Sequence, residues 1–85
     1  MTDQEIYDTV NTVFRQVLED DTIVLRPEDT SEDVEGWDSM NHIFIVVELS
    51  KRFGVKFHAA EMENLKNVGE LTALLRRKLG PPVSV

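Results

Sequence analysis

Apolar residues recur near the amino end of the chain at spacings of three and four, the period of an α-helix. They share one helical face and predict an amphipathic helix from Thr2 to Leu18. The apolar positions are Ile6, Val10, Val13, Phe14, Val17 and Leu18. Thr2 and Glu5 have the spacing of a capping box, which places the start of the helix at Thr2.

The last third of the chain predicts two further helices. A short one could span Ala59 to Leu65, and a longer one is predicted from Asn67 to Leu79. Asn67 and Glu70 have the spacing of a second capping box, and the basic run at residues 76–78 suits the carboxyl end of a helix. The apolar stripe of the longer helix consists of Val68, Leu71, Leu74, Leu75 and Leu79.

The middle segment allows two interpretations. Ile43 to Val47 is an unbroken apolar run that could form a buried strand. Helix is favoured, because Asp38 or Ser39 can cap its start, Gly54 suits the residue after its last turn, and no convincing partner strand exists. The whole chain is therefore predicted to be all-α, a small four-helix bundle of three main helices and one short helix.

The middle helix would have apolar residues on two opposite faces. The face that can line the core has Ile45, Val46, Leu49 and Phe53. The opposite face has Met40, Ile43, Phe44 and Val47. This second face is either buried in the bundle or an exposed patch that docks a partner protein, and the pattern alone leaves both interpretations open.

Length and composition restrict the function. A chain of 85 residues allows one small domain, expected at residues 1–80 with a frayed tail at 81–85, and its shallow core argues against an elaborate enzyme. A net charge of -7 argues against binding to nucleic acid or to anionic membranes. The absence of cysteine excludes a disulfide, an encoded thiol nucleophile and a cysteine zinc site. Without a signal peptide or a membrane-spanning apolar run, we expect a cytoplasmic, soluble monomer.

The charge is concentrated in one segment. Residues 1–18 have a net charge of -2, residues 19–38 of -8, and residues 39–85 of +3. The acidic segment lacks periodicity and includes Pro27 and Gly36, so it is expected to form a long loop between the first two main helices. Its carboxylates could attract basic partner surfaces. Those considered for this role are Glu28, Asp29, Glu32, Asp33 and Glu35.

The candidate chemistry lies where this loop meets the middle helix. Free N–H groups and the dipole at a helix amino terminus favour an attached or bound phosphate, and Ser39 is well placed to carry one. Ser39 or Asp38 could instead serve only as the helix cap. A serine hydrolase built from Asp38, Ser39 and His42 is rejected, because residues so close on one helix cannot align a catalytic triad. Trp37 is expected to pack the loop onto the helix.

Metal binding is not expected. A calcium loop aligned on Gly36 would begin at Ser31 and place His42 at position 12, where a bidentate glutamate is needed. His42 and His58 are interpreted as ordinary surface or helix-end histidines.

The segment from Gly36 to Phe57 resembles the phosphopantetheine attachment region of acyl carrier proteins. The hallmark of that family is Asp-Ser-Leu followed by a helix that ends in Phe-Gly; this chain has Asp38-Ser39-Met40 and Phe53-Gly54. Val68-Gly69-Glu70-Leu71 is similar to the string that opens the last helix of the family. The resemblance covers most of the chain.

The resemblance implies a carrier rather than an enzyme. Ser39 would receive 4'-phosphopantetheine from coenzyme A through a phosphopantetheinyl transferase, which Asp38 would help to recognise. The arm would then hold an acyl or aminoacyl group as a thioester, between a loading enzyme and a downstream synthase or transferase. The alternative is an unmodified helical interaction module or a degenerate carrier.

The sequence departs from the family at two places. Met40 stands where leucine is usual, and the middle helix lacks the many acids of carriers in fatty-acid synthesis. It has Asn41, His42, Phe44, Glu48, Lys51 and Arg52 instead. These departures favour a specialised pathway of fatty-acid, polyketide or peptide type over bulk fatty-acid synthesis.

Overall fold

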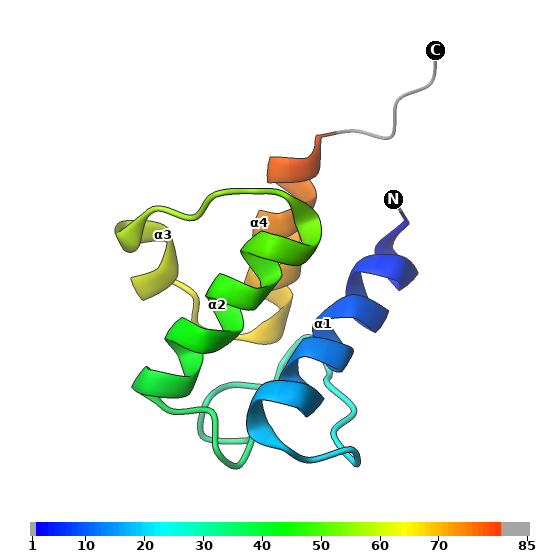
Figure 1. Cartoon of the computed structure of the whole chain (residues 1–85), viewed down its shortest axis with the longest axis vertical. Coiled ribbons are helices and arrows are strands. Elements are labelled where there is room, and N and C mark those ends of the chain that lie inside the picture. Colours follow the sequence, from blue (N-terminus) through cyan, green and yellow to red (C-terminus); the bar gives the residue numbers. More distant parts are fainter. Residues whose placement is uncertain (1, 81–85) are drawn as a thin grey trace.

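The computed structural model describes residues 2–80, which fold into four helices and no strand (Figure 1). The helices are α1 (Asp3–Leu18), α2 (Ser39–Phe53), α3 (Ala59–Glu63) and α4 (Val68–Leu79). The predicted all-α fold with a long loop between the first two helices is confirmed, and a strand at residues 43–47 is wrong. The tail expected at 81–85 lies outside the described residues.

Hydrogen bonds at the helix ends explain these boundaries. The predicted capping box of α1 is complete, because the Thr2 hydroxyl accepts from the Glu5 N–H at 3.2 Å and the Glu5 carboxylate accepts from the Thr2 N–H at 3.0 Å. The carboxylate of Asp38 caps α2. At the end of α2, Gly54 takes the left-handed conformation (φ 66°) in which glycine carries no steric penalty.

The carboxyl end of α3 and the amino-terminal cap of α4 differ slightly from the sequence prediction. α3 ends at Glu63, two residues before the predicted limit, because the link must turn to present Asn67 as the cap of α4. The Asn67 side chain accepts from the Glu70 N–H at 2.8 Å, as predicted. The Glu70 carboxylate, however, accepts from the Lys66 N–H at 2.7 Å. Its partner is therefore the residue before the cap, and not the Asn67 N–H that a capping box requires.

The core lies where α1 packs against α2 and α4. The buried face of α2 is the predicted one, with Ile45, Val46 and Leu49 inside and Phe53 partly buried against the core. Phe14 of α1 is fully buried, and its ring and the Trp37 ring form a T-shaped pair with their centroids 4.9 Å apart. None of the helices within residues 2–80 is long and apolar enough to cross a membrane.

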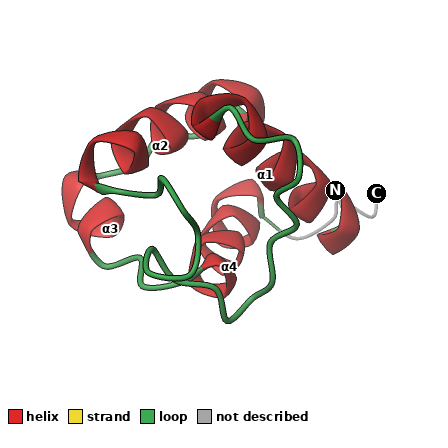
Figure 2. Cartoon of the chain, turned by 90° about the horizontal axis from the view of Figure 1, so that it is seen from below, coloured by secondary structure: helices red, strands yellow, loops and turns green. Residues whose placement is uncertain are grey.

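The long loop is held in place by hydrogen bonds to α1 and α4. The Asn11 side chain accepts from the Leu25 N–H at 2.8 Å, and Arg15 donates to the Ile23 carbonyl at 2.7 Å. The loop then passes the start of α4, where the Gly69 N–H donates to the Pro27 carbonyl at 2.8 Å (Figure 2). This route satisfies N–H groups of α4 that have no helical partner and brings the loop to the start of α2.

Not all acidic residues of the loop are free to attract a basic surface of a partner protein. Asp29 is buried, and its carboxylate accepts from the Arg26 N–H at 2.9 Å, so its expected role in attracting a basic surface is wrong. Asp33 is exposed, but its carboxylate accepts from the N–H and hydroxyl groups of Thr30, which holds its pKa below the usual value. Glu28, Glu32 and Glu35 remain exposed.

Candidate functional site

The loop delivers Ser39 to the open end of α2. Gly36 makes the last turn of the loop with φ 88°, a conformation that few other residues adopt. Asp38 is extended, and its carboxylate accepts from the Asn41 N–H at 2.8 Å. The Asn41 side chain in turn donates to the Gly36 carbonyl at 2.8 Å, which fixes the turn to the helix. Ser39 follows as the exposed first residue of α2.

The amino terminus of α2 leaves two N–H groups for a ligand. The first helical hydrogen bond of α2 runs from the His42 N–H to the Asp38 carbonyl at 2.8 Å, and the Asp38 carboxylate occupies the Asn41 N–H. The N–H groups of Ser39 and Met40 precede these bonds, and no hydrogen bond within residues 2–80 uses them. Together with the helix dipole, they favour an anion beside Ser39.

Removing the Asp38 cap should destabilise the protein without touching Ser39. An Asp38→Ala variant should lose about 1 kcal/mol of unfolding free energy, because the Asn41 N–H loses its partner. Asp38→Asn is the matched control and should stay within a few tenths of a kcal/mol of the parent, since asparagine caps equally well. Urea unfolding followed by circular dichroism measures both; equal losses in the two variants would contradict the cap assignment.

The three serines of the described residues have different surroundings. Ser39 is exposed at the start of a helix, and Ser31 is exposed in the loop. Ser50 lies near the end of α2, where its hydroxyl donates to the Val55 carbonyl. Of these three described serines, Ser39 alone combines an exposed hydroxyl with the free N–H groups of a helix amino terminus.

A groove of about 720 Å³ lies beside Ser39, between the first half of α2 and α3. It is open to solvent rather than enclosed. Its apolar wall includes Ile43, Met62 and Leu65, and charged Glu63 and Lys66 also line it. The groove offers space for a group attached to Ser39.

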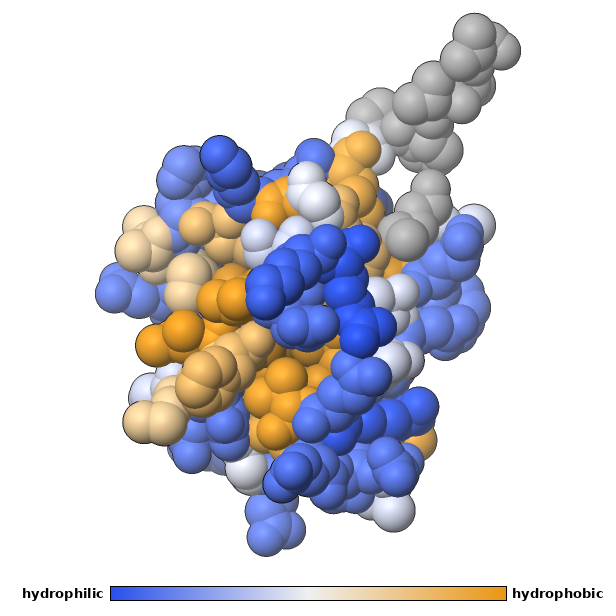
Figure 3. All heavy atoms as spheres, viewed as in Figure 1, coloured by the Kyte–Doolittle hydropathy of each residue, from blue (hydrophilic) through white to orange (hydrophobic). Residues whose placement is uncertain are grey.

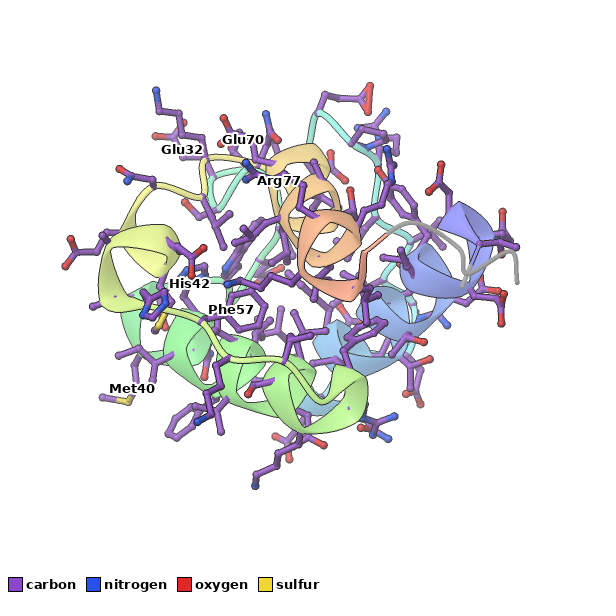
Figure 4. All side chains as sticks on the ribbon, turned by 90° about the horizontal axis from the view of Figure 1, so that it is seen from above. Glu32, Met40, His42, Phe57, Glu70 and Arg77 are labelled. Atoms are coloured by element: carbon purple, nitrogen blue, oxygen red, sulfur yellow. The ribbon has the colours of Figure 1, made fainter. Side chains whose placement is uncertain are left out.

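His42 of α2 (labelled in Figure 4) connects this helix to the preceding loop and to α3. Trp37 donates from Nε1 to His42 Nδ1 at 3.0 Å, so Nδ1 acts as the acceptor and carries no proton. The opposite nitrogen, Nε2, therefore donates to the Met62 carbonyl of α3, also at 3.0 Å. We name this arrangement of Trp37, His42 and Met62 the histidine bridge.

His42 lies in the first turn of α2, which agrees with its interpretation as a helix-end histidine, but its two ring hydrogen bonds were not predicted. The packing role of Trp37 is confirmed. Trp37 is only 4% exposed and lies immediately before the Asp38 cap, and His42 is the fourth residue of the helix. These are the two positions of a hydrophobic staple, so their spacing was a signal in the sequence. Both ring nitrogens of His42 are occupied, and the Asp38 carboxylate faces Asn41, so the rejected hydrolase triad does not assemble.

The second apolar face of α2 is exposed. The exposed fractions are Met40 67%, Ile43 51%, Phe44 55% and Val47 45%. Burial of this face in the bundle, one of the two interpretations of the sequence, is therefore wrong. Of the large hydrophobic residues exposed within residues 2–80, only Val24 lies elsewhere. We name these four α2 residues the apolar patch; Figure 3 shows apolar surface over this part of the molecule, and Figure 4 shows Met40 pointing away from the interior.

Comparison with known proteins agrees with this geometry. Residues 8–84 match the family described as phosphopantetheine attachment site. The acyl carrier protein of Thermotoga maritima is 29% identical over 77 residues, which cover 91% of this chain and 95% of that protein. The solution structure of a holo acyl carrier protein from Geobacter metallireducens superposes with a TM-score of 0.80 at 40% identity, covering 87% of this chain and 85% of that one.

A helical bundle that presents a serine at the open start of its second main helix is the architecture of a carrier domain. The chain belongs to the acyl carrier protein family, whose members bear a phosphopantetheine attachment site. The family carries acyl groups on 4'-phosphopantetheine and is not enzymatic. The predicted carrier role and prosthetic group are thereby confirmed.

Proposed function

We propose that Ser39 is the residue that bears the phosphopantetheine arm of this acyl carrier protein. The observation that supports this most is its position as the exposed first residue of α2, beside the free N–H groups of Ser39 and Met40. The residues present suit the group, because a phosphodiester on the Ser39 hydroxyl would carry a negative charge next to these N–H groups. Asp38 holds this geometry as the cap of α2.

The chemistry requires a separate phosphopantetheinyl transferase. It joins the Ser39 oxygen to the phosphopantetheine phosphorus of coenzyme A while the pyrophosphate bond breaks. The Ser39 hydroxyl gives up its proton, and adenosine 3',5'-bisphosphate leaves. When bound, the arm supplies the terminal thiol that holds an acyl or aminoacyl group as a thioester, a thiol that a chain without cysteine does not encode. The chain itself contributes the position and exposure of Ser39.

The apolar patch is proposed as the docking surface for the partner enzymes. It lies on α2 immediately after Ser39, and contiguous exposed apolar residues are typical of protein interaction sites. The one acid of α2, Glu48, pairs with Arg52 at 3.3 Å, so the helix offers little free negative charge. A complementary partner surface would be apolar rather than rich in lysine and arginine, which favours a loading enzyme and synthase of a specialised pathway.

The experiment is an intact-mass measurement on the wild-type protein. The protein is incubated with coenzyme A, magnesium and a promiscuous phosphopantetheinyl transferase. We expect a single mass gain that equals one phosphopantetheine arm. No gain with several transferases would contradict the proposal and favour a degenerate carrier or an unmodified interaction module.

A further inference from the structure

The apolar patch continues into a positive charge at its far end. Lys51 comes four residues after Val47 on α2, and residues with this spacing are neighbours on one face of a helix. The Lys51 side chain is exposed and takes part in no ion pair within residues 2–80. Its ammonium group is therefore available to a protein that docks on the patch.

The other charged residues of α2 do not offset this charge. Two bases and one acid leave the helix with a net charge of +1, and its first turn has no acid. The acid is Glu48, which pairs with Arg52 at 3.3 Å. The unpaired positive charge of the helix is therefore that of Lys51.

The opposite end of the patch has negative charge beside it. Glu32 and Glu35 are exposed in the loop that leads to α2, and the proposed phosphodiester on Ser39 adds a further negative charge. Lys51 comes twelve residues after Ser39, which corresponds to about 18 Å along the helix axis. The charge beside the patch thus changes from negative to positive along α2.

We propose that the loading enzyme that docks on the apolar patch presents an acidic side chain to Lys51, at the end of the interface farthest from the arm. A carboxylate in that place is attracted by Lys51, whereas a carboxylate near Ser39 is repelled by the acids of the loop and by the phosphodiester. This difference fixes the direction in which the enzyme binds along α2. The inference rests on the proposed roles of Ser39 and of the patch.

The test measures acylation of the holo protein by its loading enzyme, purified from the protein's source by following the acyl mass that it adds to the arm. Lys51→Glu should lower kcat/KM about tenfold at low salt, because attraction becomes repulsion, and Lys51→Gln should lower it about threefold. Both losses should shrink as sodium chloride is raised to about 0.5 M, because salt screens exposed charges. Lys51→Gln also places no acid at the negative carboxyl end of α2, so it should keep the thermal unfolding profile of the parent.

Lys56→Glu is the matched control. Lys56 is also an exposed lysine without an ion pair within residues 2–80, but it lies between α2 and α3 rather than on α2. The variant changes the net charge by the same amount as Lys51→Glu, so it measures the general effect of charge on the encounter. It should keep kcat/KM within about twofold of the wild type. An unchanged or higher kcat/KM in Lys51→Glu, or an equal loss in Lys56→Glu, would overturn the inference.

Zero-length cross-linking identifies the partner group directly. A carbodiimide should join Lys51 Nζ to an aspartate or glutamate of the loading enzyme through an amide bond, while the carbodiimide takes up the released water as a urea. Tandem mass spectrometry of the cross-linked peptides locates this bond. Cross-links that join only carboxylates of this chain to lysines of the enzyme would show a basic partner surface and contradict the inference.

The same measurements separate this inference from the proposed function. Failure of the Ser39 assignment appears earlier, as a protein that gains no arm. Failure of the docking role of the patch appears as a Phe44→Glu variant that is acylated as fast as the wild type. Failure of the present inference leaves both of those results intact and alters only the response to substitution of Lys51.

Discussion

A Ser39→Ala variant is expected to gain no mass with coenzyme A, magnesium and transferase, while the wild-type protein gains one arm. The reason is chemical, because alanine lacks the oxygen that forms the phosphodiester. The variant should keep its fold, since Ser39 is exposed and the cap of α2 comes from Asp38. Intact mass measures the modification, and circular dichroism measures the helical content.

Two other serines supply the controls. Ser31→Ala should load fully, although Ser31 lines the same groove, because it does not lie at a helix amino terminus. Ser50→Ala should also load, since the Ser50 hydroxyl is engaged with the Val55 carbonyl at the far end of α2. Loss of loading in Ser31→Ala with retention in Ser39→Ala would move the attachment site to the loop.

A Phe44→Glu variant should lower the kcat/KM of the cognate loading enzyme by about 30-fold, the effect of losing an interface contact of about 2 kcal/mol. Phe44 is 55% exposed at the centre of the apolar patch, so a carboxylate there remains in water in the free protein. At a docked apolar interface the same carboxylate would be desolvated without a partner. Steady-state kinetics with the holo protein as the varied substrate measure the loss.

Val24→Glu is the matched control, because Val24 is also an exposed apolar residue but lies in the loop rather than on α2. It should leave kcat/KM unchanged. Both variants should retain the thermal unfolding profile of the parent. An equal loss of kcat/KM in both variants would contradict a docking role specific to the patch, and unfolding of Phe44→Glu would mean that this face supports the core.

The helices could be predicted from the sequence because their signals are local. The capping box of Thr2 and Glu5 and the Gly54 stop each involve residues within a few positions of a helix end. The strand interpretation of residues 43–47 failed because these residues lie between a capped start and a glycine stop, where helical hydrogen bonds satisfy the backbone.

Features that depend on distant residues could not be predicted. The loop is ordered by Asn11 of α1 and by the start of α4, and this route buries Asp29. The second partner of His42 is a carbonyl twenty residues further along the chain, on α3. Periodicity placed Phe44 on a second apolar face but could not decide its exposure, which depends on where α1 and α4 pack.

The location of the arm tests the central claim most directly. Tryptic digestion of the modified protein yields a peptide of residues 16–51, which contains Ser31, Ser39 and Ser50 together with Thr22 and Thr30. Fragment ions in tandem mass spectrometry assign the phosphopantetheine mass to one of these hydroxyl groups. We predict that every fragment ion carrying the added mass includes Ser39 and that the unmodified fragments stop short of it. An arm located on Ser31 or on any other hydroxyl residue would contradict the account.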